Sequence, residues 1–105
     1  MHKDEATGLV LVDQDVCIAC GYCTWVCPYG APSMDDANHV MSKCTFCVDR
    51  ITEGQQPFCV ASCPANARVF GDLNDPESDV SKLLQERKGT LYLPEMGTHP
   101  SVYYV

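Results

Sequence analysis

The sequence predicts a small α+β fold in which two similar halves form a pseudo-two-fold pair, followed by a C-terminal helix and an extended tail. Three observations support this. Eight cysteines fall in two blocks of four, and the stretch from Cys23 to Ala31 aligns with the stretch from Cys59 to Ala67, 36 residues further on. Only short runs of strand or helix character lie around them. A chain of 105 residues buries only a modest apolar core, so other bonds must supplement it.

The first half is expected to begin with a strand and to continue into a cysteine-bearing loop. Residues 9–12 are a short apolar run between Gly8 and Asp13, which is typical of a strand. Residues 17–23 are expected to form an irregular loop, which Gly21 makes easier for the backbone. A short helix should follow over residues 22–27 and end at Pro28, because proline cannot continue a helix.

Three further elements are predicted before residue 71. The turn-like segment 35–38 indicates a hairpin within residues 31–41. Residues 48–54 are expected to form a short helix that Gly54 ends. Residues 68–70 are expected to return as a strand.

The C-terminal segment differs in character, because it has no cysteine. A helix is predicted to begin at Asp75, which is a suitable N-cap with Pro76 at the first helical position, and to end before Gly89. The remainder, residues 91–105, is apolar and is predicted to be extended. We therefore expect a cysteine-bearing domain over residues 1–72 and a C-terminal helix with a docking tail over residues 73–105. The alternative for the tail is that it simply covers the small core.

The cysteine spacing matches that of cubane iron–sulfur clusters. The first block reads Cys17-x2-Cys20-x2-Cys23-x3-Cys27-Pro28, the run of bacterial ferredoxins whose fourth cysteine binds a second cluster. The second block reads Cys44-x2-Cys47-x11-Cys59-x3-Cys63-Pro64. Eight thiolates can hold two [4Fe–4S] clusters with no cysteine left over. We therefore expect a bacterial di-cluster ferredoxin-like fold that transfers electrons and folds as its metal is assembled.

Two other uses of the cysteines are possible. A disulfide framework is typical of short secreted chains, but residues 1–5 contain no apolar signal segment. Two four-cysteine zinc sites usually combine separated Cys-x2-Cys pairs. A triple Cys-x2-Cys-x2-Cys run suits three corners of a cubane better, so iron–sulfur ligation is the favoured interpretation.

Composition excludes some partners. The net charge is −7, from 14 acidic and 7 basic residues, and no basic stripe exists to bind nucleic acid. No apolar run approaches the roughly 20 residues that a bilayer span needs. We therefore expect a soluble, cytoplasmic chain that reaches a membrane, or another compartment, only through a partner.

Several segments resemble a known family. The resemblance lies in Cys17–Pro32, Lys43–Arg50, Phe70–Pro76 and Gly97–Tyr104. These segments are similar to the ferredoxin-type electron-transfer subunit of molybdenum- or tungsten-bispterin oxidoreductases of the dimethyl sulfoxide reductase type. Typical members carry twice as many cysteines, and this chain is similar to their C-terminal two-cluster half. It is therefore either part of a longer subunit or a shortened natural one.

The resemblance implies crossed ligation between the two blocks. One cluster would be held by Cys17, Cys20, Cys23 and Cys63, and the other by Cys27, Cys44, Cys47 and Cys59. In the alternative, each block would bind its own cluster.

Residues near the cysteines support weaker expectations. The small residues Ala19 and Gly21 would let backbone N–H groups approach sulfur. Lys43 and Arg50 flank the second block and would favour a reduced cluster, unless they are ordinary solvated cations. The aromatic residues of the cysteine segments are expected to shield the clusters in the core rather than to relay electrons; these are Trp25, Phe46 and Phe58.

The function implied is that of an electron-transfer subunit without a catalytic site. Its partner would be a large molybdenum- or tungsten-pterin catalytic subunit, and a membrane-anchor or further electron-transfer subunit is compatible with the resemblance. The first alternative is a free-standing, diffusible 2[4Fe–4S] ferredoxin. The second is an iron–sulfur sensor, which two fully ligated clusters disfavour.

Overall fold

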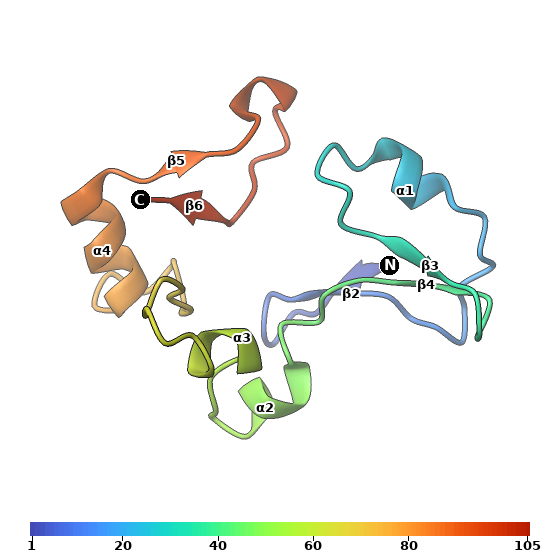
Figure 1. Ribbon diagram of the computed structural model, residues 1–105, viewed down its shortest axis with the longest axis horizontal. Helices are drawn as coiled ribbons and strands as arrows, with labels where there is room; N and C mark the ends of the chain where they lie inside the picture. The colour runs from blue at the N-terminus through green and yellow to red at the C-terminus, as the bar shows by residue number, and fades with distance from the viewer. The chain divides into compact units, whose positions relative to one another are not determined.

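The computed structural model describes all 105 residues, and the chain divides into two compact units, Met1–Gln55 and Gln56–Val105. Figure 1 shows their elements in chain order. The first unit contains β1 (His2–Lys3), β2 (Val10–Leu11), α1 (Tyr22–Val26), β3 (Ser33–Asp35), β4 (Val40–Ser42) and α2 (Val48–Thr52). The second contains α3 (Phe58–Ala61), α4 (Asp79–Arg87), β5 (Thr90–Leu91), the 3-10 helix η1 (Pro94–Met96) and β6 (Tyr103–Tyr104). The fold is therefore a small mixture of short helices and strands.

All three sheets are antiparallel pairs. In β1–β2, His2 lies opposite Leu11, and in β5–β6, Thr90 lies opposite Tyr104. The β1–β2 turn is closed by the Asp4 carboxylate, which accepts hydrogen bonds from the backbone N–H (2.9 Å) and the hydroxyl of Thr7. The strand predicted over residues 9–12 is thus present, although shorter, and its partner β1 was not predicted.

The hairpin predicted within residues 31–41 is confirmed as β3–β4. Met34 lies opposite Met41, and Asp35 begins the turn. The Asp35 carboxylate accepts hydrogen bonds from the Ala37 N–H at 3.1 Å and from the Asn38 side-chain amide at 2.8 Å. The bonds from Asn38 are the main reason that the pKa of Asp35 is below its ordinary value. The turn is therefore stabilised by the ionised carboxylate, and this contribution is lost as the pH falls through the lowered pKa.

Two predicted features are wrong. Residues 68–70 form no strand, because none of the three sheets supplies a pairing partner. Helix α4 begins at Asp79 rather than next to Asp75. Its N-cap is Ser78, whose hydroxyl oxygen accepts the Ser81 N–H at 3.3 Å. Asp75 instead accepts the Glu77 N–H at 3.0 Å in the turn that precedes the helix.

Within the second unit, two glycines allow segments to pack closely. A Cβ atom at Gly71 would lie 3.0 Å from a methyl group of Val80 on α4. A Cβ atom at Gly89 would lie 2.4 Å from Leu84 and 3.1 Å from Tyr103 of β6. The lack of a side chain at Gly89 therefore lets the end of the tail pack against the end of α4.

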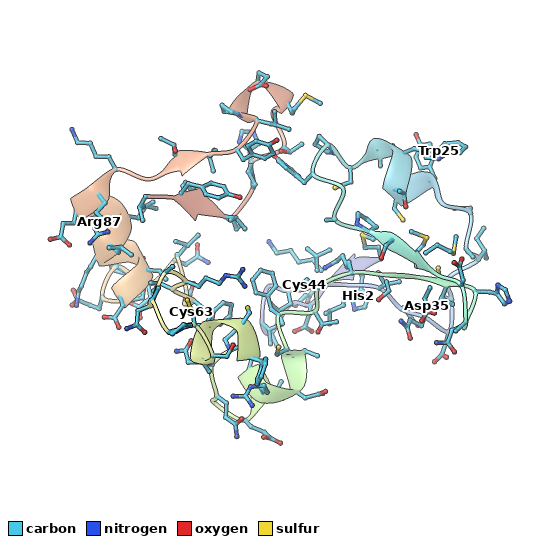
Figure 2. All side chains as sticks on the ribbon, viewed as in Figure 1. His2, Trp25, Asp35, Cys44, Cys63 and Arg87 are labelled. Atoms are coloured by element: carbon cyan, nitrogen blue, oxygen red, sulfur yellow. The ribbon has the colours of Figure 1, made fainter.

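Few apolar side chains are buried. Leu9 is 7% exposed, Met41 is 3% exposed and Pro57 is fully buried, whereas Trp25 is 82% exposed on the outer side of α1 (Figure 2). Phe58 is 64% exposed and Phe46 is 37% exposed, so the expectation that Trp25, Phe46 and Phe58 lie in the core is wrong. Burial of side chains alone supplies little of the stability of this protein.

The turn at Asp35 gives a first testable prediction. Replacing Asp35 by Ala should lower the thermal midpoint of the cluster-loaded protein at neutral pH, because two N–H donors and the Asn38 amide lose their acceptor. Asp36→Ala is the matched control, since it removes the same charge from the same turn. Equal midpoints for the two variants would contradict a specific role of the Asp35 carboxylate.

Candidate iron–sulfur site

The first three cysteines line one hollow in the first unit. This hollow has a volume of about 360 Å³ and contains Cys17, Cys20 and Cys23 in its wall. The rest of its lining is mostly apolar and comes from the N-terminus, the loop that follows β2, α1 and β4: Met1, Val12, Asp13, Val16, Ile18, Ala19, Tyr22, Val26 and Met41. Cys27 is not among these residues. Three sulfurs of the first block therefore share a space much larger than one water molecule, which takes up about 30 Å³.

A tight turn and strand β4 position Cys17. The Cys17 N–H donates to the Asp13 carbonyl at 3.0 Å, which forms the turn that leads into the cysteine loop. The Cys17 sulfur accepts the Met41 N–H at 3.4 Å, so a strand 24 residues away holds it. This bond, followed by one from the Ala19 N–H, lowers the pKa of the Cys17 thiol. The environment thus favours the thiolate, the form that binds metal.

Both Cys-x2-Cys loops contain a left-handed residue at the same position. Ala19 has φ 55° and Phe46 has φ 54°, and each directly precedes the second cysteine of its pair. The Phe46 N–H donates to the Cys44 sulfur at 3.4 Å, as the Ala19 N–H does to Cys17. A left-handed conformation costs a non-glycine residue about 1–2 kcal/mol. In both loops the N–H of this same residue donates to the sulfur of the first cysteine.

The two Cys-x3-Cys-Pro segments also share local structure. Helix α1 begins at Tyr22 and α3 begins at Phe58, which is the same 36-residue separation as in the sequence. After each Cys-Pro pair comes a left-handed residue, Gly30 with φ 65° and Asn66 with φ 48°. The N–H groups of these residues donate to the carbonyls of Cys27 (3.4 Å) and Cys63 (3.2 Å).

The turn after Cys63 also brings donors to its sulfur. The Ala67 N–H donates to the Cys63 sulfur at 3.4 Å. The N–H groups of Ala67 and then Ala65 are the main reason that the pKa of Cys63 is lowered. Three of the eight sulfurs, those of Cys17, Cys44 and Cys63, thus accept a backbone N–H at the same distance of 3.4 Å.

The structure places six of the eight cysteines in the first unit and two in the second. The first six are Cys17, Cys20, Cys23, Cys27, Cys44 and Cys47, and the last two are Cys59 and Cys63 (Figure 2 labels Cys44 and Cys63). None is in a disulfide. No three side chains of cysteine, histidine, aspartate or glutamate are close enough together to bind one metal ion. Thiolates repel one another, and their bonds to iron draw them together. The chain therefore determines the conformation of the local loops, and metal binding determines the final positions of the sulfur atoms.

The chemistry of these donors fits iron–sulfur clusters. Thiolates are the ligands of such clusters, and N–H donors to sulfur are among the features that set their potentials. The hollow at the first block is lined mostly by apolar side chains. Sequence reasoning missed the Met41 donor, which depends on β4, and the left-handed position of Phe46.

Comparison with known proteins settles the family. Residues 1–73 match the family described as "4Fe-4S dicluster domain". This chain therefore belongs to that family. Two clusters of the [4Fe–4S] type on eight cysteines agree with this membership and with the spacing described above.

The relatives are named as subunits of oxidoreductases. The chain is 50% identical to a sulfite dehydrogenase subunit of Allochromatium vinosum over 99% of this chain and 46% of that protein. It is 40% identical to a tetrathionate reductase subunit of Salmonella typhimurium over 93% of this chain and 40% of that protein. It is 51% identical to a polypeptide of the anaerobic dimethyl sulfoxide reductase of Escherichia coli over 71% of this chain and 36% of that protein.

These matches confirm the resemblance to iron–sulfur subunits of the dimethyl sulfoxide reductase type. The chain spans less than half the length of these curated relatives. None of its helices has the length and apolar character needed to cross a membrane.

The cluster content can be measured directly. The purified, anaerobically handled chain should contain about eight irons and about eight acid-labile sulfides, because each cubane carries four of each. Metal analysis with sulfide determination checks this. Two zinc ions without sulfide would contradict the presence of iron–sulfur clusters and would favour two four-cysteine zinc sites.

Proposed function

We propose that this chain is an electron-transfer subunit that passes single electrons to or from a large molybdenum- or tungsten-pterin catalytic subunit. The observation that carries the proposal is the combination of a dicluster domain with relatives named as subunits of oxidoreductases. When bound, the clusters would supply one-electron transfer. The names of the relatives argue against a free-standing ferredoxin.

In this proposal the chain contributes no catalytic residue. Its polar side chains are used in turns and caps, as at Asp35 and Ser78, and its cysteines are used as ligands. Substrate chemistry would take place on the partner. We also propose that the clusters are inserted in the cytoplasm and that the subunit acts there; the alternative is export of the folded subunit together with a partner that bears a signal. A membrane-anchor subunit would be a further partner.

We also propose the crossed ligand sets. Cys17, Cys20, Cys23 and Cys63 would hold one cluster, and Cys27, Cys44, Cys47 and Cys59 would hold the other. The support is local: Cys17, Cys20 and Cys23 share one hollow, whereas Cys27 does not line it. Cys27 lies past the end of α1 in an extended conformation (φ −76°, ψ 113°), so its backbone has already left the helix that carries Cys23.

Crossed ligation makes a specific prediction for two variants, one in α1 and one just past its end. Cys27→Ser should damage the cluster of Cys44, Cys47 and Cys59, whereas Cys23→Ser should damage the other cluster. Paramagnetic resonance of the reduced proteins distinguishes the two signals, with Cys47→Ser as the reference for the second cluster. If Cys27→Ser and Cys23→Ser removed the same signal, each block would bind its own cluster and the crossed assignment would be wrong.

The tail from Thr90 to Val105 is proposed as a docking surface for the catalytic subunit. The β5–β6 pair is held together by its backbone and by the Thr90 hydroxyl, which donates to the Tyr104 carbonyl at 3.3 Å. The rings of Tyr92 and Tyr104 contact each other edge to face, with centroids 6.5 Å apart, yet they are 56% and 60% exposed. Tyrosine is enriched at protein interfaces because it combines a large apolar body with a polar tip.

Around the tyrosines lie further exposed apolar side chains: Met96, Val102 and Val105. The packing of Tyr103 and Val105 at Gly89 would hold this surface on the end of α4. The alternative, that the tail only covers a core, is supported by these contacts at Gly89 but not by the exposure of the tyrosines.

The docking proposal is tested on the native complex. The chain should co-purify with a large pterin-containing polypeptide, and deletion of residues 90–105 should weaken the association at least about tenfold while iron content stays unchanged. Tyr92→Ala combined with Tyr104→Ala should act in the same direction, with Lys82→Ala on α4 as a surface control. If the truncated chain loses its iron, the tail belongs to the cluster fold and the docking role is wrong. A monomeric protein with no partner would favour the free ferredoxin.

A further inference from the structure

Lys43 is fixed beside the first cysteine of the second block. Its ammonium group donates to the carbonyl oxygen of Cys44 at 2.9 Å. Its side chain is half-buried and lines a second hollow, of about 190 Å³, between β2, β4 and α2. The other residues of that lining are Leu11, Val12, Gln14, Ser42, Thr45 and Val48. The ammonium group of Lys43 is therefore held beside the backbone of Cys44, a proposed cluster ligand, and does not move among many solvated positions.

The first block has a carboxylate in its surroundings, together with the N-terminal residue Met1. Asp13 lines the hollow that contains Cys17, Cys20 and Cys23. Its carboxylate accepts the Asp15 N–H at 3.1 Å, which fixes the side chain in the turn leading to Cys17. On α2, next to the second block, Asp49 and Arg50 carry charges of opposite sign. Lys43 is thus a cation held at the second block, and Asp13 is an anion held at the first.

A fixed charge acts differently on the two oxidation states of a cluster. Reduction adds one electron and no proton, so the cluster with its four thiolates becomes more negative by one unit. A nearby cation therefore lowers the free energy of the reduced state more than that of the oxidised state, and a nearby carboxylate does the reverse. The effect is stronger in a partly apolar lining than in open water, because the lining screens the charge less.

We propose that Lys43 raises the reduction potential of the cluster held by Cys44 and Cys47, and that Asp13 lowers the potential of the cluster held by Cys17, Cys20 and Cys23. Lys43 and Asp13 would act through their charges and are not cluster ligands. The inference deepens the proposed electron-transfer function and depends on the chain holding both clusters. A single electron, supplied by a chemical reductant or by a redox partner, would then reside mainly on the cluster beside Lys43.

The test is a redox titration of the isolated, cluster-loaded chain, followed by paramagnetic resonance. Lys43→Met removes the charge but keeps the length of the stem, and it should lower the potential of one signal only. That signal is the one that Cys47→Ser abolishes. Lys43→Arg keeps the charge and should leave both potentials close to those of the unmodified chain. Asp13→Asn keeps the acceptor for the Asp15 N–H and should raise the potential of the other signal.

Lys82→Met is the control for loss of a surface cation, because Lys82 is paired with Glu77 at 3.4 Å on the exposed side of α4. It should shift neither potential. Unchanged potentials in Lys43→Met, or equal shifts of both signals, would overturn the proposal. If Lys43→Met loses iron, Lys43→Gln is the second neutral variant. Loss of iron in both would mean that Lys43 acts on assembly rather than on potential, which also overturns it.

These outcomes are separate from those of the proposed function. Absence of clusters from the unmodified chain would contradict the cofactor and the electron-transfer role together. Failure to bind a catalytic subunit would contradict only the proposed partner, since the titration uses the chain alone. A shift confined to one signal would support the role of Lys43 whatever the identity of that partner.

Discussion

Bonds between thiolates and iron are the interactions on which this small protein depends. A chain with so few buried apolar side chains, chiefly Leu9, Met41 and Pro57, gains little from burial. Eight cysteines supply the missing stabilisation, because each cluster is bonded to four of them and so ties their loops together. Short helices of four or five residues and two- or three-residue strands would be marginal on their own. They suffice here because their task is to carry ligands.

The local structure of the cysteine segments serves the sulfur atoms. Backbone N–H groups point at Cys17, Cys44 and Cys63, and left-handed residues lie in the loops and turns that supply several of these donors. The conformational cost at Ala19, Phe46 and Asn66 is offset in a cluster-loaded protein by charge-assisted bonds to thiolate, which are stronger than bonds to a neutral thiol. The same donors stabilise negative charge, so one arrangement serves both assembly and electron uptake.

Turn residues and helix stops made the local elements predictable. The hairpin β3–β4 follows from the Asp35–Asn38 turn, and α1 ends before Pro28 because proline cannot continue a helix. The wrong predictions concern elements whose existence or bounds depend on contacts between different segments of the chain. The predicted strand at residues 68–70 lacks a pairing partner. The N-cap of α4 is Ser78 instead of Asp75, and the Ser78 hydroxyl also donates to the Asp72 carbonyl at 2.6 Å. Asp75 satisfied the composition rule for an N-cap equally well, so sequence alone could not choose between the two.

The sequence by itself determined the chemistry: the number, spacing and type of ligands identify two [4Fe–4S] clusters, because that pattern is read directly along the chain. The tertiary structure decided what surrounds the ligands. It brought the Met41 N–H to Cys17 across 24 residues, placed three cysteines with Asp13 in one hollow, and held Lys43 on the Cys44 carbonyl. Charges and hydrogen bonds act through distances in space, and sequence spacing does not specify distances between segments that fold onto one another.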